Sequence, residues 1–371
     1  MSAEDLAQLR DSVDRWVDRD YPLERHRAAK ASTVGYDEAA WQAFAELGWL
    51  GLPIAEEHGG AGLDDAAFLS VMTAIGRGLL VEPVLSSCML GAGLLASCGS
   101  ATQQAAILPE IVAGRVKLAL AYAEPRLGYA RGPIATSAKP DAAVWLLTGD
   151  KCAVLDGPIA DRLLVTARDP QDALAVFLVD RAASGMEQRS WTTVDGRHAA
   201  DVTFSECQAE RLGSGDAADT LDLVLDRATL AVSAEAVGVM DFLVNETTAY
   251  LKTRKQFGQP LSRFQVLQHR LVDMFIALEE CRGMVDAALA ALQADTAERQ
   301  ATCSALKVQT CKAGRLIGGE AVQLHGGMGM TDELKIGHAF KRLMQIEAMF
   351  GNADFHAARY ATASGVLSLP A

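Results

Sequence analysis

The stretch with the clearest capacity for chemistry is a cation-rich turn at residues 252–269. It reads Lys-Thr-Arg-Lys-Gln-Phe-Gly-Gln-Pro-Leu-Ser-Arg-Phe-Gln-Val-Leu-Gln-His. Arg254 offers planar donors that match a phosphate or pyrophosphate, and Gln256 and Gln265 offer amides that can hydrogen-bond a heterocycle. The same residues also suit a solvated helix end, so the turn alone leaves both interpretations open.

Two helices must position this turn. Gly258 and Pro260 interrupt the chain, and glycine and proline are the usual residues of such breaks. Apolar side chains then recur at spacings of three and four residues, at Leu267, Leu271, Met274, Leu278, Cys281 and Val285. This periodicity is typical of an amphipathic helix. The pattern therefore predicts one helix that ends at the turn and a second that folds back from it.

A glycine-rich stretch, Gln323-Leu-His-Gly-Gly-Met-Gly-Met-Thr331, lies between two further predicted helices. Because it follows no predicted strand, it is not the dinucleotide-binding fingerprint of a βαβ unit. Its glycines would allow the backbone to approach a ligand closely. We interpret His325, beside these glycines, as a packed and hydrogen-bonded histidine rather than a base.

Together the two stretches resemble the flavin-contacting segments of the acyl-CoA dehydrogenase family, and the resemblance covers nearly the whole chain. Within that family the chain looks most similar to the small subunits of bacterial two-subunit enzymes such as pimeloyl-CoA dehydrogenase. The resemblance implies FAD as the cofactor, an acyl-CoA as the substrate and α,β-dehydrogenation of the thioester as the reaction. It also implies an electron-transfer flavoprotein as the electron acceptor.

The resemblance further implies that two subunits share each flavin, one holding the ring and the other the adenosine-pyrophosphate end. The second half-site matches the family at Arg254, Gln256, Phe257, Leu261, Gln265, Gln323, Gly326 and Gly327. The ring half-site departs from the family. Ala123-Glu-Pro-Arg-Leu-Gly-Tyr129 replaces a Thr-Glu-Pro-x-x-Gly-Ser motif, and Ala153-Val-Leu155 replaces an aromatic-Ile-Thr/Ser wall.

The catalytic base also departs from the family pattern, because Phe350 stands where the family has its carboxylate. Some members carry the base on the helix before the cation-rich turn. Asp226 lies two residues before the aligned position, Ala228, and Glu235 lies two turns after it. Each is a candidate base, and each is also interpretable as a surface carboxylate or an ion-pair partner of Arg227.

Three hypotheses about function follow. In the first, the chain is an enzyme subunit without a working base that contributes a flavin half-site to a paralogous catalytic subunit in a heterotetramer. In the second, it is a self-sufficient homo-oligomeric acyl-CoA dehydrogenase that uses Asp226 or Glu235. In the third, it is a flavin oxidase or monooxygenase on the same fold. The acyl chain of the substrate is not readable from the sequence.

Composition excludes other classes of function. The chain has 371 residues, half of them hydrophobic, and a net charge of −13, which disfavours binding to nucleic acid and to acidic membrane surfaces. Its seven cysteines contain no CxxC pair, so we expect neither a disulfide framework nor a zinc site. The start lacks the pattern of a signal peptide, and no membrane span is expected. These features favour a cytoplasmic protein.

The periodicities predict an α+β multidomain fold. Helices are expected at 4–20, 37–47, 64–77, 84–98 and 102–111, which define an all-α domain over residues 1–117. Short β-rich runs separated by turns predict an antiparallel sandwich or barrel over 118–212. Helices at 218–253, 265–293, 297–326 and 333–348 predict a C-terminal four-helix bundle over 213–371.

Overall fold

The computed structural model describes residues 2–131, 134–142 and 144–366. Contacts divide the chain into two compact units. We name them the bundle unit (Met1–Arg27, Leu69–Leu80 and Thr229–Ala371) and the sheet unit (Ala28–Phe68 and Val81–Ala228). These units group residues by contact, and the domain boundaries at 117 and 212 stay a prediction. Among the described helices, none combines the length and the apolar character needed to cross a membrane.

The N-terminal third is helical, as the sequence predicts. It contains α1 (Ala3–Asp20), α2 (Leu23–Ala31), α3 (Glu38–Glu46), α4 (Asp65–Gly78), α5 (Ala92–Cys98) and α6 (Ala101–Val112), with 3-10 turns at η1 (Trp49–Gly51) and η2 (Glu56–His58). The helix expected at 84–98 begins with a π-helical segment, η3 (Leu85–Gly91), and continues as α5. Such segments are seldom signalled by sequence.

Local chemistry explains why one of these helices was predicted and another was not. Ser2 caps α1, because its hydroxyl accepts a hydrogen bond from the Asp5 amide at 3.1 Å and the Asp5 carboxylate reaches back to Ser2. This is a capping box, and it marks the start of a helix in the sequence. Helix α2 is mostly polar, so it lacks the apolar period on which the prediction depended.

The β segment consists of β1 (Leu118–Ala121), β2 (Ser137–Asp141), β3 (Val144–Leu155), β4 (Arg162–Arg168), β5 (Leu174–Asp180), β6 (Met186–Thr192) and β7 (His198–Arg211). The β-rich runs at 144–148, 162–167, 173–179 and 201–204 overlap β3, β4, β5 and β7, whereas β1, β2 and β6 were not predicted. Most side chains of β2 and β6 are exposed or half-buried, so neither strand has the apolar alternation that predicts a strand. Strand β1 is only four residues long.

The strand pairings close a ring through β4, β2, β3, β7 and β5, while β1 adds to β4 and β6 adds to β7. Of the two alternatives left open by the sequence, the barrel is therefore the correct one. The pairings of β4 with β1 and with β2 are parallel and the other described pairings are antiparallel, so the sheet is mixed. Its interior is filled by small and aromatic side chains, among them Phe177 and Phe204.

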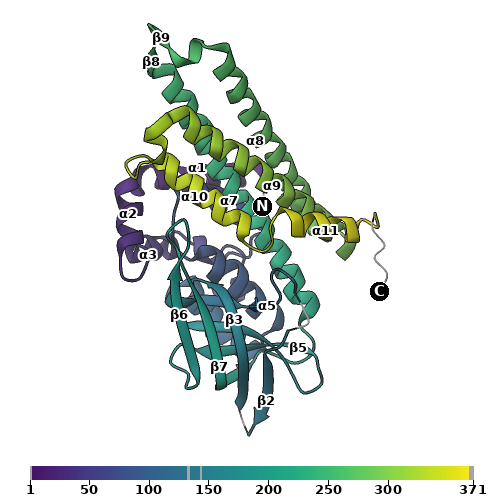
Figure 1. Cartoon of the computed structure of the whole chain (residues 1–371). Helices are drawn as coiled ribbons and strands as arrows, with labels where there is room; N and C mark the ends of the chain where they lie inside the picture. The colour runs from purple at the N-terminus through teal and green to yellow at the C-terminus, as the bar shows by residue number, and fades with distance from the viewer. Residues whose placement is uncertain (1, 132–133, 143, 367–371) are drawn as a thin grey trace. The chain divides into compact units, whose positions relative to one another are not determined.

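The C-terminal part contains α7 (Ala218–Thr253), α8 (Gln265–Ala291), α9 (Thr296–His325) and α10 (Lys335–Ala348), which confirms the four predicted helices. A two-stranded ribbon, β8 (Lys255–Gln256) with β9 (Gln259–Pro260), joins α7 to α8 at the tip of a long hairpin (Figure 1). A fifth helix, α11 (Ala353–Ala363), was not predicted. Its N-cap, Asn352, accepts from the Phe355 amide at 3.0 Å and was the available signal.

Two glycines let α4 and α7 touch backbone to backbone inside the bundle unit. A Cβ at Gly76 would lie 1.9 Å from the carbonyl oxygen of Glu235, and a Cβ at Gly238 would lie 1.9 Å from that of Thr73. No side chain fits at those distances. The contact therefore fixes the position of α7 along α4, and with it the position of the Glu235 carboxylate.

We expect Gly238→Ala to lower the free energy of unfolding by about 1–3 kcal/mol, because the new methyl group forces the two helices apart. Gly319→Ala is the matched control. Gly319 lies in α9, and a Cβ there meets nothing within 4 Å, so this change should raise stability by about 0.5–1 kcal/mol. Urea unfolding of both variants measures the difference. Equal effects of the two substitutions would contradict the close contact.

Candidate functional site

The cation-rich turn forms the tip of the α7–α8 hairpin. Phe257 and Gly258 are its two central residues, with φ of 55° and 81°, which is the backbone of a type I′ turn. Phe257 packs edge-to-face on Phe264 with ring centroids 6.0 Å apart, yet its side chain is 90% exposed. The turn therefore presents a large aromatic side chain to the outside of the bundle unit.

Three of the predicted cofactor-binding side chains are exposed and uncommitted, which means that they make no hydrogen bond or ion pair within the described chain. Arg254 follows α7, Gln265 is the first residue of α8, and Gln323 lies in the last turn of α9. In the part of the chain that the structure describes, none of the three side chains has a hydrogen-bond or ion-pair partner. A guanidinium and two amides in this state are available to a ligand.

The two sequence motifs meet at one end of the bundle unit. Tyr250 of α7 stacks on His325 of α9, with ring centroids 4.4 Å apart and planes 25° from parallel. This stack joins the helix that enters the hairpin to the helix that ends at Gly326. A Cβ at Gly326 or Gly327 would meet nothing within 4 Å, so an open backbone surface adjoins the stack.

The remaining residues of this half-site are occupied with the hairpin itself. The Gln256 amide donates to the Lys255 carbonyl at 2.8 Å. Leu261 is half-buried, and its N–H donates to the Arg254 carbonyl at 2.8 Å. These contacts shape the turn that presents Arg254, and they leave Gln256 with less capacity for a ligand than Gln265 or Gln323.

The motif predicted to face the flavin ring lies in the sheet unit and is held by a buried polar network. The carboxylate of Glu124 accepts hydrogen bonds from the Ala135 amide (2.7 Å), the Thr136 hydroxyl (2.6 Å) and the Lys151 ammonium (2.8 Å). Burial acts to raise the pKa of Glu124, but these hydrogen bonds outweigh it and lower the pKa to about 2. Glu124 is therefore a structural anion.

The candidate base Asp226 is fully buried in the sheet unit. Its carboxylate lies 3.6 Å from the Arg131 guanidinium, which also binds Asp222 one turn earlier on α7. Arg227 instead pairs with Asp65 at 2.9 Å. The alternatives of a surface carboxylate and of a partner for Arg227 were therefore both wrong for Asp226, because burial demands a partner and the loop after β1 provides Arg131.

The other candidate base, Glu235, is fully buried in the bundle unit and forms a two-pronged ion pair with Arg342 of α10. Both contacts measure 2.7 Å. Removing one partner of such a pair typically costs about 3–5 kcal/mol. Glu235 is thus neither a surface carboxylate nor a partner of Arg227, and its two oxygens are occupied by Arg342.

Phe350 lies on a buried turn between α10 and α11. Its φ is 58°, and only 6% of its surface is exposed. The Lys307 ammonium of α9 donates to the carbonyls of Met349 (2.6 Å) and Gly351 (2.7 Å) on either side of it. Burial lowers the pKa of Lys307 to about 8. Sequence reasoning missed Lys307, although a lone lysine among apolar helix positions was the available signal.

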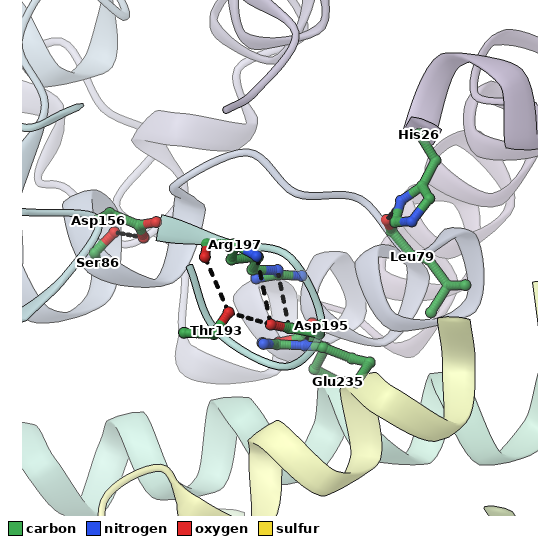
Figure 2. A network of polar contacts seen from close by, with 9 residues as sticks. His26, Leu79, Ser86, Asp156, Thr193, Asp195, Arg197 and Glu235 are labelled. Atoms are coloured by element: carbon green, nitrogen blue, oxygen red, sulfur yellow. Dashed lines mark hydrogen bonds and ion pairs between the residues drawn. The ribbon is translucent and has the colours of Figure 1, made fainter. Parts of the chain in front are cut away.

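Polar contacts of the sheet unit that the sequence did not indicate are shown in Figure 2. The Ser86 hydroxyl of η3 donates to the Asp156 carboxylate at 2.5 Å. In the β6–β7 connection, Asp195 accepts from Thr193 and lies 3.7 Å from the Arg197 guanidinium. These contacts stabilise irregular backbone. Glu235, which is also labelled in Figure 2, belongs to the bundle unit.

Three family models of the acyl-CoA dehydrogenases match the chain. The N-terminal domain model matches residues 3–115, the middle domain model matches 119–210 and the C-terminal domain model matches 219–364. A solved structure named "Tcur3481-Tcur3483 steroid ACAD G363A variant" shares 30% identity with a TM-score of 0.90 and covers 98% of each chain. The chain belongs to the acyl-CoA dehydrogenase family.

Two further relatives from Mycobacterium tuberculosis are similar along their whole length. The acyl-CoA dehydrogenase FadE27 is 28% identical over 362 residues, 95% of this chain and 94% of that protein. The crystal structure of the ChsE4-ChsE5 complex matches with 26% identity and a TM-score of 0.90, and covers 100% of this chain and 99% of that one.

Acyl-CoA dehydrogenases depend on FAD, so the residues present can be tested for their fit to it. The uncommitted Arg254 guanidinium suits a pyrophosphate, since planar donors bind phosphate oxygens in pairs. The open backbone at Gly326 and Gly327 allows a ligand to approach without a steric clash. The chemistry of these residues is therefore compatible with a pyrophosphate group.

We expect Glu124→Gln to change how stability depends on pH. A carboxyl whose pKa falls from 4.5 to about 2 on folding stabilises the native state fully above the higher value and loses this effect as pH drops toward the lower one. The variant should lose about 1–3 kcal/mol at neutral pH and show a flatter profile between pH 4.5 and 2. Urea unfolding across that range measures both effects.

The control is Glu187→Gln, which removes an exposed carboxylate of β6 in the same sheet unit. It should leave both the neutral stability and the acid slope close to those of the unchanged protein. A Glu124→Gln profile parallel to that of the unchanged protein would show that the network does not hold Glu124 as an anion.

Proposed function

We propose that this chain is a subunit of an FAD-dependent acyl-CoA dehydrogenase that lacks a working base and contributes a flavin half-site to a paralogous catalytic partner. The reaction is α,β-dehydrogenation of an acyl-CoA thioester. The observation that carries the proposal is a contrast between the cofactor-binding side chains and the candidate bases. Arg254, Gln265 and Gln323 are exposed and uncommitted, whereas the candidate bases are held in buried ion pairs.

The absence of a base follows from what each candidate carboxylate already does. A bound FAD supplies the hydride acceptor for this reaction, while removal of the α-proton needs a carboxylate within hydrogen-bond reach of the substrate. Asp226 is paired with Arg131, and Glu235 is paired with Arg342. Phe350 cannot accept a proton. The proton must therefore go to a carboxylate of the partner.

An exposed apolar surface on α8 supports association with that partner. Val272, Phe275 and Ile276 are about half exposed, and Phe275 and Ile276 each lie about one turn after Val272 on the same helical face. Exposed apolar patches of this kind mark interaction sites. Two similar solved structures carry double names, Tcur3481-Tcur3483 and ChsE4-ChsE5. This proposal includes three further points. The chain is similar to small subunits such as that of pimeloyl-CoA dehydrogenase, it assembles into a heterotetramer, and its electron acceptor is an electron-transfer flavoprotein.

The flavin content of the purified chain tests the proposal directly. Expressed alone, the chain should retain little flavin in its visible spectrum and should not oxidise acyl-CoA substrates. In complex with its partner, the oligomer should contain one flavin per two polypeptides. One flavin per chain together with dehydrogenation by the chain alone would support the homo-oligomeric alternative, in which Asp226 or Glu235 acts as base, and would overturn the subunit proposal.

We expect Arg254→Gln to weaken retention of the flavin in the complex by about tenfold to a hundredfold, because a charge-assisted hydrogen bond contributes about 1.5–3 kcal/mol. The matched control is Arg263→Gln, which removes an exposed guanidinium of the same hairpin. Flavin release during dialysis, followed by fluorescence, compares the variants. Equal release from both would place the pyrophosphate away from Arg254.

A further inference from the structure

The bundle unit contains a cleft of about 680 Å³ that none of the functions above uses. Its walls come from the end of α1, the end of α4, the last turns of α7, the end of α9 and the start of α10. Within α9, Gln323 of the candidate flavin half-site and His325 of the cleft point in different directions. Gln323 is exposed there, whereas His325, two residues and about 200° further around the helix, is buried.

One wall of the cleft is an uncapped helix N-terminus. Helix α10 has 14 residues, and its N-cap, Leu334, provides no side-chain hydrogen bond. Within the described residues, the N–H groups of Lys335, Ile336 and Gly337 have no acceptor. The first turn of a helix concentrates such donors and carries a partial positive charge, so it attracts oxyanions.

The side chain of Lys335 adds a full positive charge at the same place. It is half-buried, and its ammonium lies 5.9 Å from the centroid of the Phe242 ring. No carboxylate of the described chain lies within 4 Å of it. Burial lowers the pKa of Lys335, and the more distant Asp18 and Glu246 only partly offset this effect. The ammonium is therefore short of a counterion.

A second, independent group faces the cleft with an unused hydrogen-bonding atom. His325 is only 6% exposed, and its Nδ1 donates to the Ala321 carbonyl at 2.8 Å. In the neutral ring this leaves Nε2 as an acceptor, and it has no partner in the described part of the chain. The stack on Tyr250 fixes the plane of the ring.

We propose that this cleft binds a small organic oxyanion, a carboxylate or a phosphate ester, that also carries a hydroxyl group. The anionic group binds the first turn of α10 and the Lys335 ammonium, and the hydroxyl group donates to Nε2 of His325. Pairing or exposure to solvent weakens the repulsion between the acidic residues of the cleft and a bound anion. Asp18 is paired with Arg77 at 2.7 Å, and Glu246 and Glu333 are exposed to solvent.

Calorimetric titration of the full-length protein tests the proposal with three probes. Glycerol 3-phosphate carries both the anion and the hydroxyl groups, inorganic phosphate carries only the anion, and glycerol carries only the hydroxyl groups. We expect binding in the order glycerol 3-phosphate, phosphate, glycerol. Absence of binding by both anions at millimolar concentration would overturn the proposal, whatever the variants do.

Four variants locate the site. Lys335→Met keeps the length of the side chain and should weaken glycerol 3-phosphate about tenfold to a hundredfold, whereas Lys335→Arg should retain most of the affinity. His325→Phe keeps a stacking ring and should weaken glycerol 3-phosphate more than phosphate. Lys312→Met, at an exposed lysine of α9, is the control. An equal loss in Lys312→Met and Lys335→Met would show a non-specific charge effect and overturn the site.

Discussion

Buried charge is the constraint on which much of this structure depends. An ion that leaves water must find a counterion or several dipoles inside the protein, or it will neutralise. Glu235 meets this demand through Arg342, and Lys307 meets it through the carbonyl oxygens of one turn. In the sheet unit, Lys151 and Glu124 meet it through each other. Each solution ties together segments that are distant in sequence.

The same constraint separates a charge that supports structure from one that supports chemistry. A carboxylate that already receives two hydrogen bonds from a guanidinium has both oxygens occupied by that partner. This is the condition of Glu235. Arg254 and Lys335 are different, since each is a cation without a carboxylate beside it in the described chain. The unbalanced charges, rather than the paired ones, mark the surfaces that can bind an anionic ligand.

Much of the fold was predictable from periodicity and capping. The long helices α7, α8 and α9 follow from apolar spacing, and α1 follows from the Ser2 capping box. The polar strands β2 and β6 were missed because they are held by neighbours in the barrel rather than by their own burial, which no local pattern records. Helix α2 was missed for a related reason, since its sequence has helix formers but no apolar stripe.

The candidate site was predictable only in part. The motifs that contain Arg254 and Gln323 stand out by residue type, and the Tyr250–His325 stack brings their helices together. The partners of Asp226 and Glu235 were not predictable. Arg131 precedes Asp226 by 95 positions and Arg342 follows Glu235 by 107, so both ion pairs depend on tertiary contacts. The uncapped start of α10 was equally unpredictable, because only the folded structure shows which N–H donors lack an acceptor.

The turn that holds Phe350 has a further consequence, which concerns how such a protein can change through evolution. Lys307 binds the carbonyl groups on either side of residue 350, so these backbone contacts do not involve the side chain between them. The identity of residue 350 is thereby separated from the shape of the turn. Exchange of the residue there would keep the carbonyl contacts of the turn, but the new side chain would have to fit the buried space that Phe350 fills.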